Sequence, residues 1–162
     1  MTNRSFKILL LNWQDIKNPL SGGAEVHLHE IFKRVVKRGH QVTLLCCHYK
    51  GAVDEEIVDG IRVVRRGPRN IFNYMVPVEY KKLVKKESFD IIIDDINKIP
   101  FYTPLYVKEP ILGMVHHFFG KSIFLQTSFL PAQYVYLAEK LVPPIYRNVP
   151  FAVVSESTRQ EM

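Results

Sequence analysis

The chain has 162 residues, the length of one ordinary domain. Hydrophobic residues make up 47% of it, which suits a packed core and argues against disorder. No apolar run approaches the roughly 20 residues of a membrane span, and the run Phe6 to Leu11 is too short for a signal peptide. The adjacent Cys46 and Cys47 are badly placed to bond each other, so we expect reduced thiols in a cytoplasmic protein.

The formal net charge of +6 is concentrated in one segment. Arg62 to Lys86 holds eight basic residues and a single acid, Glu79, so this segment alone carries +7. A basic patch of this kind suggests an anionic partner, such as nucleic acid, anionic lipid headgroups or a phosphorylated substrate. A solvated helix face with scattered lysines is an equally good interpretation.

The first 47 residues predict a strand, a helix and a second strand. Residues Phe6 to Asn12 form a continuous apolar run, as in a strand buried on both faces. An apolar stripe at helical spacing predicts a helix over Ala24 to Arg38, which Gly39 ends. Gln41 to Cys47 is the next strand. Two such strands joined by a helix imply a parallel, right-handed arrangement.

The remaining segments extend this pattern. Glu56 to Val64 predicts a hairpin with its turn at Asp59-Gly60. A helix is expected over Phe72 to Lys86, kinked or restarted at Pro77. Further strands are predicted at Phe89 to Ile93, Ile111 to Val115 and Val149 to Val154, with a helix inside Ser128 to Tyr146. The fold class is therefore α/β, a Rossmann-like open, mostly parallel sheet with helices on both faces.

The last residues predict the start of another helix. Ser157 with Gln160, and Thr158 with Glu161, both fit the capping-box spacing that opens a helix. We therefore expect residues 1–154 to form the domain, and residues 155–162 to begin a connection to a further domain.

Ligands of open parallel sheets gather at the carboxyl ends of the strands. Those ends hold Gly22 and Gly23, Asp94 and Asp95 with Asn97, the pair His116 and His117, and Ser155. Each feature also has an ordinary structural explanation. The aspartates suit loop solvation and helix capping, or acceptor binding and general-base catalysis.

Gly22 and Gly23 precede the first predicted helix. They either allow a ligand to approach the helix amides or serve a tight turn that needs positive φ. The motif is neither GxGxxG nor a P-loop. Glu25, in the first turn, already satisfies the helix dipole, or receives sugar hydroxyls instead.

The histidines give no metal site. His27 and His29 lie two residues apart and so on different helix faces. His116 and His117 are adjacent at a strand end, where one imidazole points into the cleft, and no third ligand follows nearby. We expect hydrogen bonding to a hydroxyl or phosphate there.

The ordered series SGGAE, FDIII, VHH and VVSEST resembles the amino-terminal domain of glycosyltransferase family 4, also called group 1, over nearly the whole chain. The resemblance implies half of a GT-B fold, in which two Rossmann-like domains face each other across a cleft. It implies sugar transfer from a nucleotide-sugar donor to a glycan or lipid-linked acceptor, with retention of anomeric configuration and without a metal or other cofactor.

The resemblance also implies roles for particular residues. Gly22 and Gly23 would approach the donor diphosphate and sugar, and His116 would contact the transferred sugar as the catalytic candidate. The acceptor candidates are Glu25, Asp95, Asn97 and His117. The family's donor signature, two glutamates seven residues apart, lies in the second domain. We therefore expect residues 1–162 to be the acceptor-side half, inactive by itself.

The resemblance gives the basic segment Arg62–Lys86 a candidate role in peripheral contact with the inner face of a membrane. Three alternatives stay open. One is a nucleotide- or phosphate-binding domain of another enzyme class, including an epimerase. The others are a receiver-type signalling domain and a basic nucleic-acid-binding module, although no known nucleic-acid module pattern is present and we expect no such partner.

Overall fold

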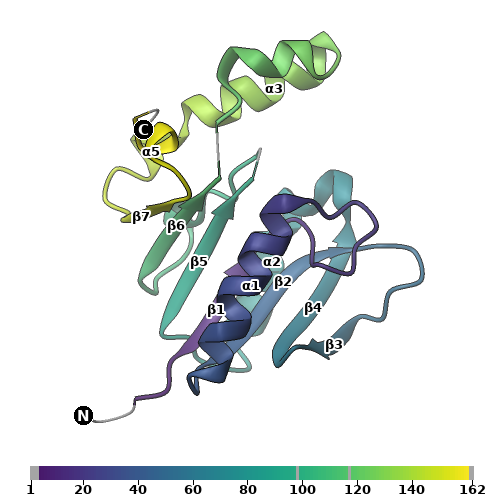
Figure 1. Cartoon of the computed structure of the whole chain (residues 1–162), viewed down its shortest axis with the longest axis vertical. Helices are drawn as coiled ribbons and strands as arrows, with labels where there is room; N and C mark the ends of the chain where they lie inside the picture. The colour runs from purple at the N-terminus through teal and green to yellow at the C-terminus, as the bar shows by residue number, and fades with distance from the viewer. Residues whose placement is uncertain (1–3, 98, 117, 161–162) are drawn as a thin grey trace.

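The computed structural model describes residues 4–97, 99–116 and 118–160. Within these ranges seven strands form a single sheet in the order β3-β4-β2-β1-β5-β6-β7 (Figure 1). All neighbouring strands are parallel except β3 and β4, which are antiparallel. The strands are β1 (Lys7–Leu11), β2 (Gln41–His48), β3 (Glu55–Val58), β4 (Ile61–Pro68), β5 (Ile91–Ile96), β6 (Ile111–Val115) and β7 (Phe151–Val153).

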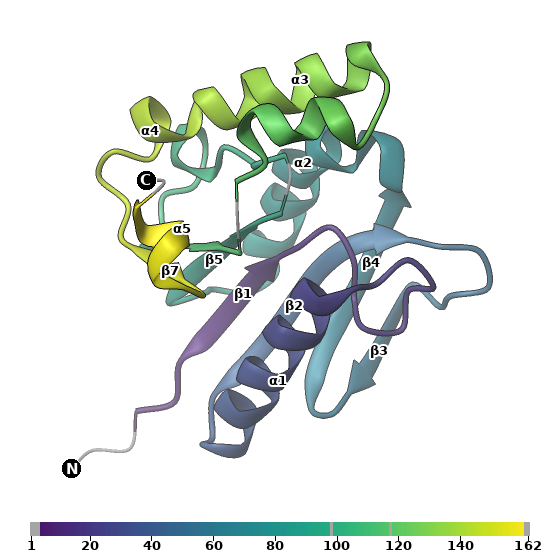
Figure 2. The same cartoon turned by 45° about the horizontal axis from the view of Figure 1, so that its top comes forward.

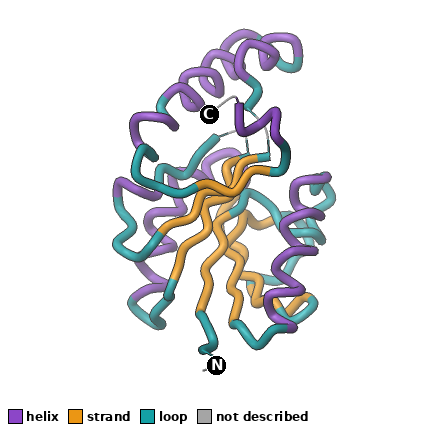
Figure 3. The backbone as a smooth tube through the Cα atoms, turned by 60° about the vertical axis from the view of Figure 1, so that its left-hand side comes forward, coloured by secondary structure: helices purple, strands orange, loops and turns teal. Residues whose placement is uncertain are grey.

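Helices cover both faces of the twisted sheet (Figure 3), as the sequence predicts. The α-helices are α1 (Gly23–Lys37), α2 (Phe72–Val84), α3 (Phe129–Lys140), α4 (Val142–Ile145) and α5 (Glu156–Gln160). Short 3-10 helices are η1 (Arg69–Ile71), η2 (Thr103–Leu105) and η3 (Gly120–Leu125). Among the helices so described, none combines the length and the apolar character needed to span a bilayer.

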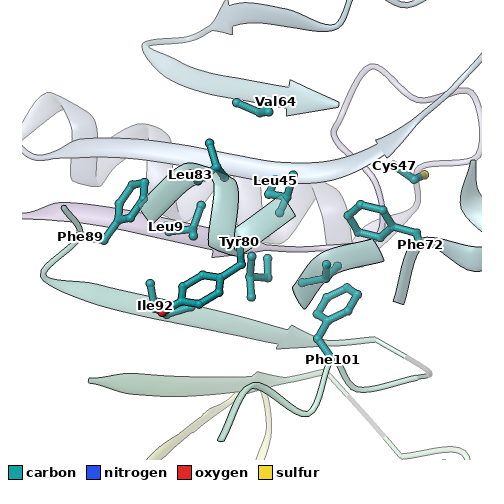
Figure 4. Close-up of a cluster of buried hydrophobic side chains, with 12 residues drawn as sticks. Leu9, Leu45, Cys47, Val64, Phe72, Tyr80, Leu83, Phe89, Ile92 and Phe101 are labelled. Atoms are coloured by element: carbon teal, nitrogen blue, oxygen red, sulfur yellow. The ribbon is translucent and has the colours of Figure 1, made fainter. Parts of the chain in front are cut away.

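The core divides into layers because successive strand side chains point to opposite faces. Leu10 of β1 packs on one face with Leu28 and Phe32 of α1. Leu9 packs on the other face, in the cluster shown in Figure 4, with Phe72 and Tyr80 of α2. The two remaining clusters lie under α4 and α3.

The first strand–helix–strand unit and the hairpin are confirmed. β1 and β2 pair in parallel on either side of the α1 crossover. Val58 pairs with Ile61 across the turn, where Asp59 and Gly60 have φ of 50° and 84°. Positive φ at both central residues is the geometry of a tight hairpin turn. Cys46 and Cys47 are free and belong to opposite core layers, as expected.

Several elements differ from the predictions, and β4, for example, continues past Val64 to Pro68. β5 continues past Ile93 through both aspartates to Ile96, because those residues pair with β6 as well. α2 runs through Pro77 as one helix. α5 begins at Glu156, earlier than the capping patterns indicated, because the hydroxyl of Ser155 accepts a hydrogen bond from Thr158 N–H (3.2 Å).

The basic segment Arg62–Lys86 does not form one cationic patch. Arg65 is fully buried, whereas Arg62 pairs with Glu55 and Glu87. Arg66 pairs with Glu55, and Lys82 pairs with Glu79. The exposed cations of this segment are Arg69, Lys81, Lys82, Lys85 and Lys86. The expected patch is therefore reduced to Arg69 near the end of β4 and the lysines of the last turns of α2 and just beyond.

Candidate functional site

A pocket of about 520 Å³ lies beyond the carboxyl end of β1. It brings together four of the predicted site residues, Gly22, Gly23, Glu25 and Asn97. They meet because β1 and β5 are neighbours in the sheet, so the segments that follow them emerge side by side. The remaining lining residues are Trp13, Gln14, Leu20, Ala24, Arg69, Asn70 and Ile99.

Neither glycine of the pair is required by the local structure. Gly22 has φ −132° and ψ −159°, and Gly23 is not among the residues with positive φ. A Cβ on Gly23 would meet no heavy atom within 4 Å, and one on Gly22 would meet Glu25 Oε2 at 3.6 Å, an ordinary contact. The tight-turn explanation, which needs positive φ, is therefore wrong. Gly22 is the N-cap of α1, a position that glycine suits, and the absence of a side chain at both residues leaves the first amides of the helix accessible.

The amino terminus of α1 forms one wall of the pocket. Gly22 N–H donates to Glu25 Oε2 (2.7 Å), so the carboxylate already occupies one amide. Val26 N–H donates to the Gly22 carbonyl (3.1 Å), which closes the first helical turn. The amides of Gly23, Ala24 and Glu25 precede that bond and have no helical carbonyl to contact. Together with the helix dipole they favour an anionic or hydroxyl-bearing ligand.

Glu25 connects this wall to the segment after β5. Its side chain is buried, and its Oε1 accepts a hydrogen bond from Asn97 Nδ2 (3.2 Å). A carboxylate and a carboxamide therefore lie side by side in the pocket, a combination that can accept and donate hydrogen bonds to sugar hydroxyls.

Arg69 was not predicted as a site residue, although it belongs to the basic segment. It follows β4 directly and lines the pocket together with Asn70. In the amide orientation that satisfies both of its polar atoms, Gln14 accepts a hydrogen bond from Arg69 Nε (2.8 Å) and donates to the Leu20 carbonyl (2.8 Å). A guanidinium held at the pocket edge is suited to a phosphate or carboxylate.

Trp13 supplies an apolar wall of the same pocket. Its indole Nε1–H donates to the Ile99 carbonyl (3.0 Å), and its ring stacks on Phe101 with centroids 5.7 Å apart. The tryptophan is thereby fixed between the segment after β1 and the segment after β5. An aromatic wall of this kind suits the apolar face of a sugar ring. Its place between two strand ends was not visible in the sequence.

His116 and Asp95 form a second polar group at the same edge of the sheet. His116 Nε2 lies 3.0 Å from Asp95 Oδ1, and the aspartate is fully buried in β5. Asp95 Oδ2 has no hydrogen-bond partner in the described part of the chain. Neither of these two side chains lines the pocket. The rings of His27 and His116 pack edge to face, with their centroids 5.4 Å apart. Asp95, expected to contact the acceptor, is hydrogen-bonded to His116, and its contact with an acceptor stays a prediction.

Burial and the hydrogen bond between these two side chains shift the pKa of both groups. The hydrogen bond to Asp95 raises the pKa of His116, and the nearby charge of Glu25 acts in the same direction. Burial raises the pKa of Asp95, which the hydrogen bond from His116 opposes. Thr158 Oγ1 also donates to the His116 carbonyl (3.0 Å), so the start of α5 is attached to this residue. The candidate His117 lies outside the described residues.

A buried ion pair holds the β1–α1 connection in place. Asp15 accepts from Arg65 at both carboxylate oxygens, at 2.7 Å from Nε and 2.9 Å from Nη2. Burial alone would raise the pKa of Asp15, but the bonds from Arg65 and from Lys17 N–H lower it below its usual value. Both partners are almost completely buried. The pocket residues Trp13 and Gln14 directly precede this anchor.

Asp94 occupies a separate buried network. Its Oδ2 accepts from Thr103 Oγ1 (2.6 Å) and from the Tyr146 hydroxyl (2.5 Å), so it joins β5 to η2 and to the end of α4. Burial raises the pKa of Asp94 to about 6. The solvated or helix-capping role expected for both aspartates is wrong, because each lies inside β5 and is fully buried.

No group of three or more histidine, cysteine, aspartate or glutamate side chains is arranged to hold a metal ion in residues 4–97, 99–116 and 118–160. The polar groups of the pocket are instead amides, a carboxylate, carboxamides and one guanidinium. This set is suited to hydrogen-bonding a polyhydroxylated or phosphorylated ligand.

Comparison with known proteins matches this arrangement to one family. The family model described as Glycosyltransferase Family 4 matches residues 21–162, which begins at the Ser21-Gly22-Gly23 loop of the pocket. No curated protein matches the chain. Since the matched region covers most of the sequence, the chain belongs to glycosyltransferase family 4.

Proposed function

We propose that this domain is the acceptor-side half of a hexosyltransferase that moves a sugar from a nucleotide-sugar donor to a glycan or lipid-linked acceptor, with retention of anomeric configuration. The observation that supports this most is the Gly22–Gly23 pair. Glycine is required there neither by φ nor by packing, yet both residues line a polar pocket at a helix amino terminus. Close approach of the donor explains both.

In this proposal the free amides at the start of α1 contact the donor diphosphate and the transferred sugar. Loss of the nucleoside diphosphate is the step at which negative charge develops, so fixed amide dipoles and the Arg69 guanidinium stabilise the leaving group. The nucleoside itself binds a second domain of the GT-B type. We therefore expect residues 1–162 alone to bind donors weakly and to transfer little sugar. No metal or other cofactor is required.

The acceptor enters between Trp13, Glu25 and Asn97. Glu25 and Asn97 hydrogen-bond its hydroxyls, and the indole packs against the apolar face of a sugar ring. His116 contacts a hydroxyl of the transferred sugar, and Asp95 is a positioning residue that orients the imidazole.

Because Cys46 and Cys47 are free thiols, we propose a reducing, cytoplasmic location.

Saturation-transfer NMR with a panel of nucleotide sugars tests the proposal. Saturation from the protein should reach the hexose protons more strongly than the base and ribose protons, because this half contacts the sugar and diphosphate. A nucleotide-binding domain of another enzyme class would give the reverse order, with base and ribose protons saturated most. That result would count against the transferase assignment.

The variant Gly23→Ala sharpens the same experiment. The added methyl group has free space in the unliganded protein, and alanine at a helical position costs up to about 1 kcal/mol less than glycine. We expect unchanged or slightly higher thermal stability together with loss of saturation transfer to the hexose. Lys37→Ala, in the last turn of α1, is the matched control and should bind as the wild type does. Equal saturation transfer in all three proteins would refute the role of the glycine pair.

A further inference from the structure

A second pocket, with a volume of about 380 Å³, is formed by the second half of the chain. We call it the α3–α4 pocket, because the end of α3 and the start of α4 line it, together with the segment after β6 and the start of β7. Figure 2 shows α3 and α4 following one another along one end of the sheet, before the chain turns back to β7. The residues that line this pocket all differ from those of the pocket beyond β1, and its volume is typical of small-molecule sites. It is therefore a separate candidate site.

Four aromatic side chains contribute to the walls of the α3–α4 pocket. They are Phe118, Tyr136, Tyr146 and Phe151. The rings of Tyr146 and Phe151 pack with their centroids 5.9 Å apart. Phe151 lies against Gly113 of β6, since a Cβ on that glycine would come within 2.4 Å of the phenylalanine ring. Aromatic walls offer a large, rigid apolar area that suits a planar ligand.

Hydrogen bonds hold these walls in place. The two carboxylate oxygens of Glu139 accept from the N–H groups of Phe119 and Gly120, each at 2.8 Å, so the segment after β6 is attached to α3. The Tyr146 hydroxyl donates to Asp94 Oδ2 (2.5 Å), which attaches the end of α4 to β5. A pocket that is formed before its ligand arrives loses little conformational entropy on binding.

The side-chain charges that reach solvent at the α3–α4 pocket are positive. Lys140 and Arg147 line it and are exposed, and neither forms an ion pair with any residue that the structure describes. The Lys140 ammonium lies over the Tyr136 ring, with Nζ 4.5 Å from the ring centroid. Glu139, the acid of the described lining, is buried and bonded to two backbone amides. An anion at the edge of the pocket would therefore contact two available cations.

The lining offers few hydrogen-bonding groups for a sugar. Besides the two cations and Glu139, its described residues are phenylalanine, tyrosine, valine, glycine and proline. The Tyr146 hydroxyl already donates to Asp94. A polyhydroxylated ligand would leave buried hydroxyls without partners, which costs free energy. The α3–α4 pocket therefore suits a different class of ligand from the pocket of Glu25 and Asn97.

An aromatic lining with two cations at its edge is complementary to an aromatic anion. We propose that the α3–α4 pocket binds a small planar aromatic molecule that carries one acidic group, a carboxylate or a phosphate. The rings cover the apolar body of this ligand, and Arg147 and Lys140 contact its acidic group. The proposal involves neither the donor nor the acceptor of a sugar transfer, so it goes beyond the proposed function and stands or fails separately.

Isothermal titration calorimetry with 2-naphthoate tests the proposal without any sugar. The neutral 2-naphthalenemethanol and the cationic 2-naphthylmethylammonium have the same ring system and differ in charge. We expect the wild-type chain to bind 2-naphthoate at least about tenfold more tightly than the alcohol, because hydrogen bonds to charged groups are the stronger ones. The ammonium compound should bind most weakly, and added salt should reduce the preference for the acid.

The variant Arg147→Gln separates recognition of the acid from the integrity of the pocket. Because this side chain is exposed, the variant should remain folded, lose most of the preference for 2-naphthoate and bind the alcohol as the wild type does. Arg38→Gln, which changes an exposed arginine just after α1, is the matched control. Leu137→Asn changes the exposed side of α3, outside the pocket. Both controls should bind 2-naphthoate with wild-type affinity.

Backbone amide shifts on addition of 2-naphthoate locate the bound molecule. The largest shifts should fall on residues 118–120 and 146–151, and the amides of Gly22 and Gly23 should not move. Failure of the wild type to bind 2-naphthoate would overturn the proposal, as would equal affinity for the acid and the alcohol. Wild-type affinity in Arg147→Gln, or a loss of binding in Leu137→Asn, would place the molecule elsewhere and overturn it as well.

Discussion

Two regions of this domain reverse the usual distribution of polar and apolar groups, in opposite directions. Behind and beside the pocket, Asp15, Arg65, Asp94 and Asp95 are almost completely buried. On the outer sides of α2 and α3, leucines and aromatic residues such as Tyr74, Leu130 and Leu137 are exposed. The buried polar groups find most of their partners inside the protein, where they orient the connections that form the site. The exposed apolar groups are not covered by any described part of the chain.

The buried ion pair of Asp15 and Arg65 should give the largest effect of a single substitution. Asp15→Ala leaves the buried guanidinium of Arg65 with only Glu56 and the Val53 carbonyl as partners, at a cost of about 3 kcal/mol in the free energy of unfolding. Urea unfolding followed by circular dichroism measures it. Arg34→Ala, which removes an exposed pair with Glu30 on α1, is the control and should change little. A loss below about 1 kcal/mol for Asp15→Ala would show that the pocket connection does not depend on this anchor.

The sequence predicts the elements of the fold better than it predicts these interactions. The strand–helix–strand unit and the hairpin depend on local periodicity and turn residues, which can be read from single segments. The pairing of Asp15 with Arg65 joins residues that are 50 positions apart, and it follows from the neighbouring positions of β1, β2 and β4. The sequence did not predict that β5 continues to Ile96, because Asp94 and Asp95 interrupt its apolar run.

The candidate site likewise contains residues that the sequence predicted and residues that it did not. Gly22, Gly23, Glu25 and Asn97 were predicted because the carboxyl ends of adjacent parallel strands meet at one edge. Arg69 was not predicted as a site residue, because its place in the pocket depends on how the chain turns after β4. The helical content of α3 was predictable, but its sequence is apolar on two sides. Which side is covered depends on where η3 packs, so the exposed side of α3 can be identified only from the fold.

The second prediction concerns Asp94, whose burial makes stability depend on pH. Its pKa in the folded protein, about 6, lies above the ordinary value of 3.8. The folded state therefore favours the protonated carboxyl. Its contribution is fully present below the unfolded pKa and is lost as the pH rises through about 6, by on the order of 3 kcal/mol in total.

Asp94→Asn removes this titration while keeping an oxygen for Thr103 and Tyr146. Relative to the wild type, the variant should therefore gain stability between about pH 4 and about pH 8, which urea unfolding at both pH values measures. The exposed Asp59 has a pKa lowered by its bond to His29, so Asp59→Asn should show an effect of the opposite sign, at pH values below the ordinary pKa of 3.8. A difference between wild type and Asp94→Asn that stays constant with pH would show that the carboxylate is stabilised by other groups.

The smallest expected effect is on the pKa of His116, the catalytic candidate, which is hydrogen-bonded to Asp95. The hydrogen bond that the buried carboxylate accepts from the imidazole raises the pKa of His116, so Asp95→Asn should lower it. NMR titration of the imidazole Cε1 proton measures the shift directly. Asp59→Asn, which alters a different histidine–aspartate pair, should leave the His116 titration unchanged.

Saturation transfer from a nucleotide sugar then separates orientation from stability. If Asp95 positions His116 for the donor, Asp95→Asn reduces transfer to the hexose protons and changes its pH dependence, while the Gly23 amide and Arg69 still hold the diphosphate. If Asp95 is merely structural, the variant unfolds more easily but binds the sugar as the wild type does at every pH. The second result would class this buried aspartate with Asp15 and Asp94, as a support of the fold, and leave His116 to act without a positioning residue.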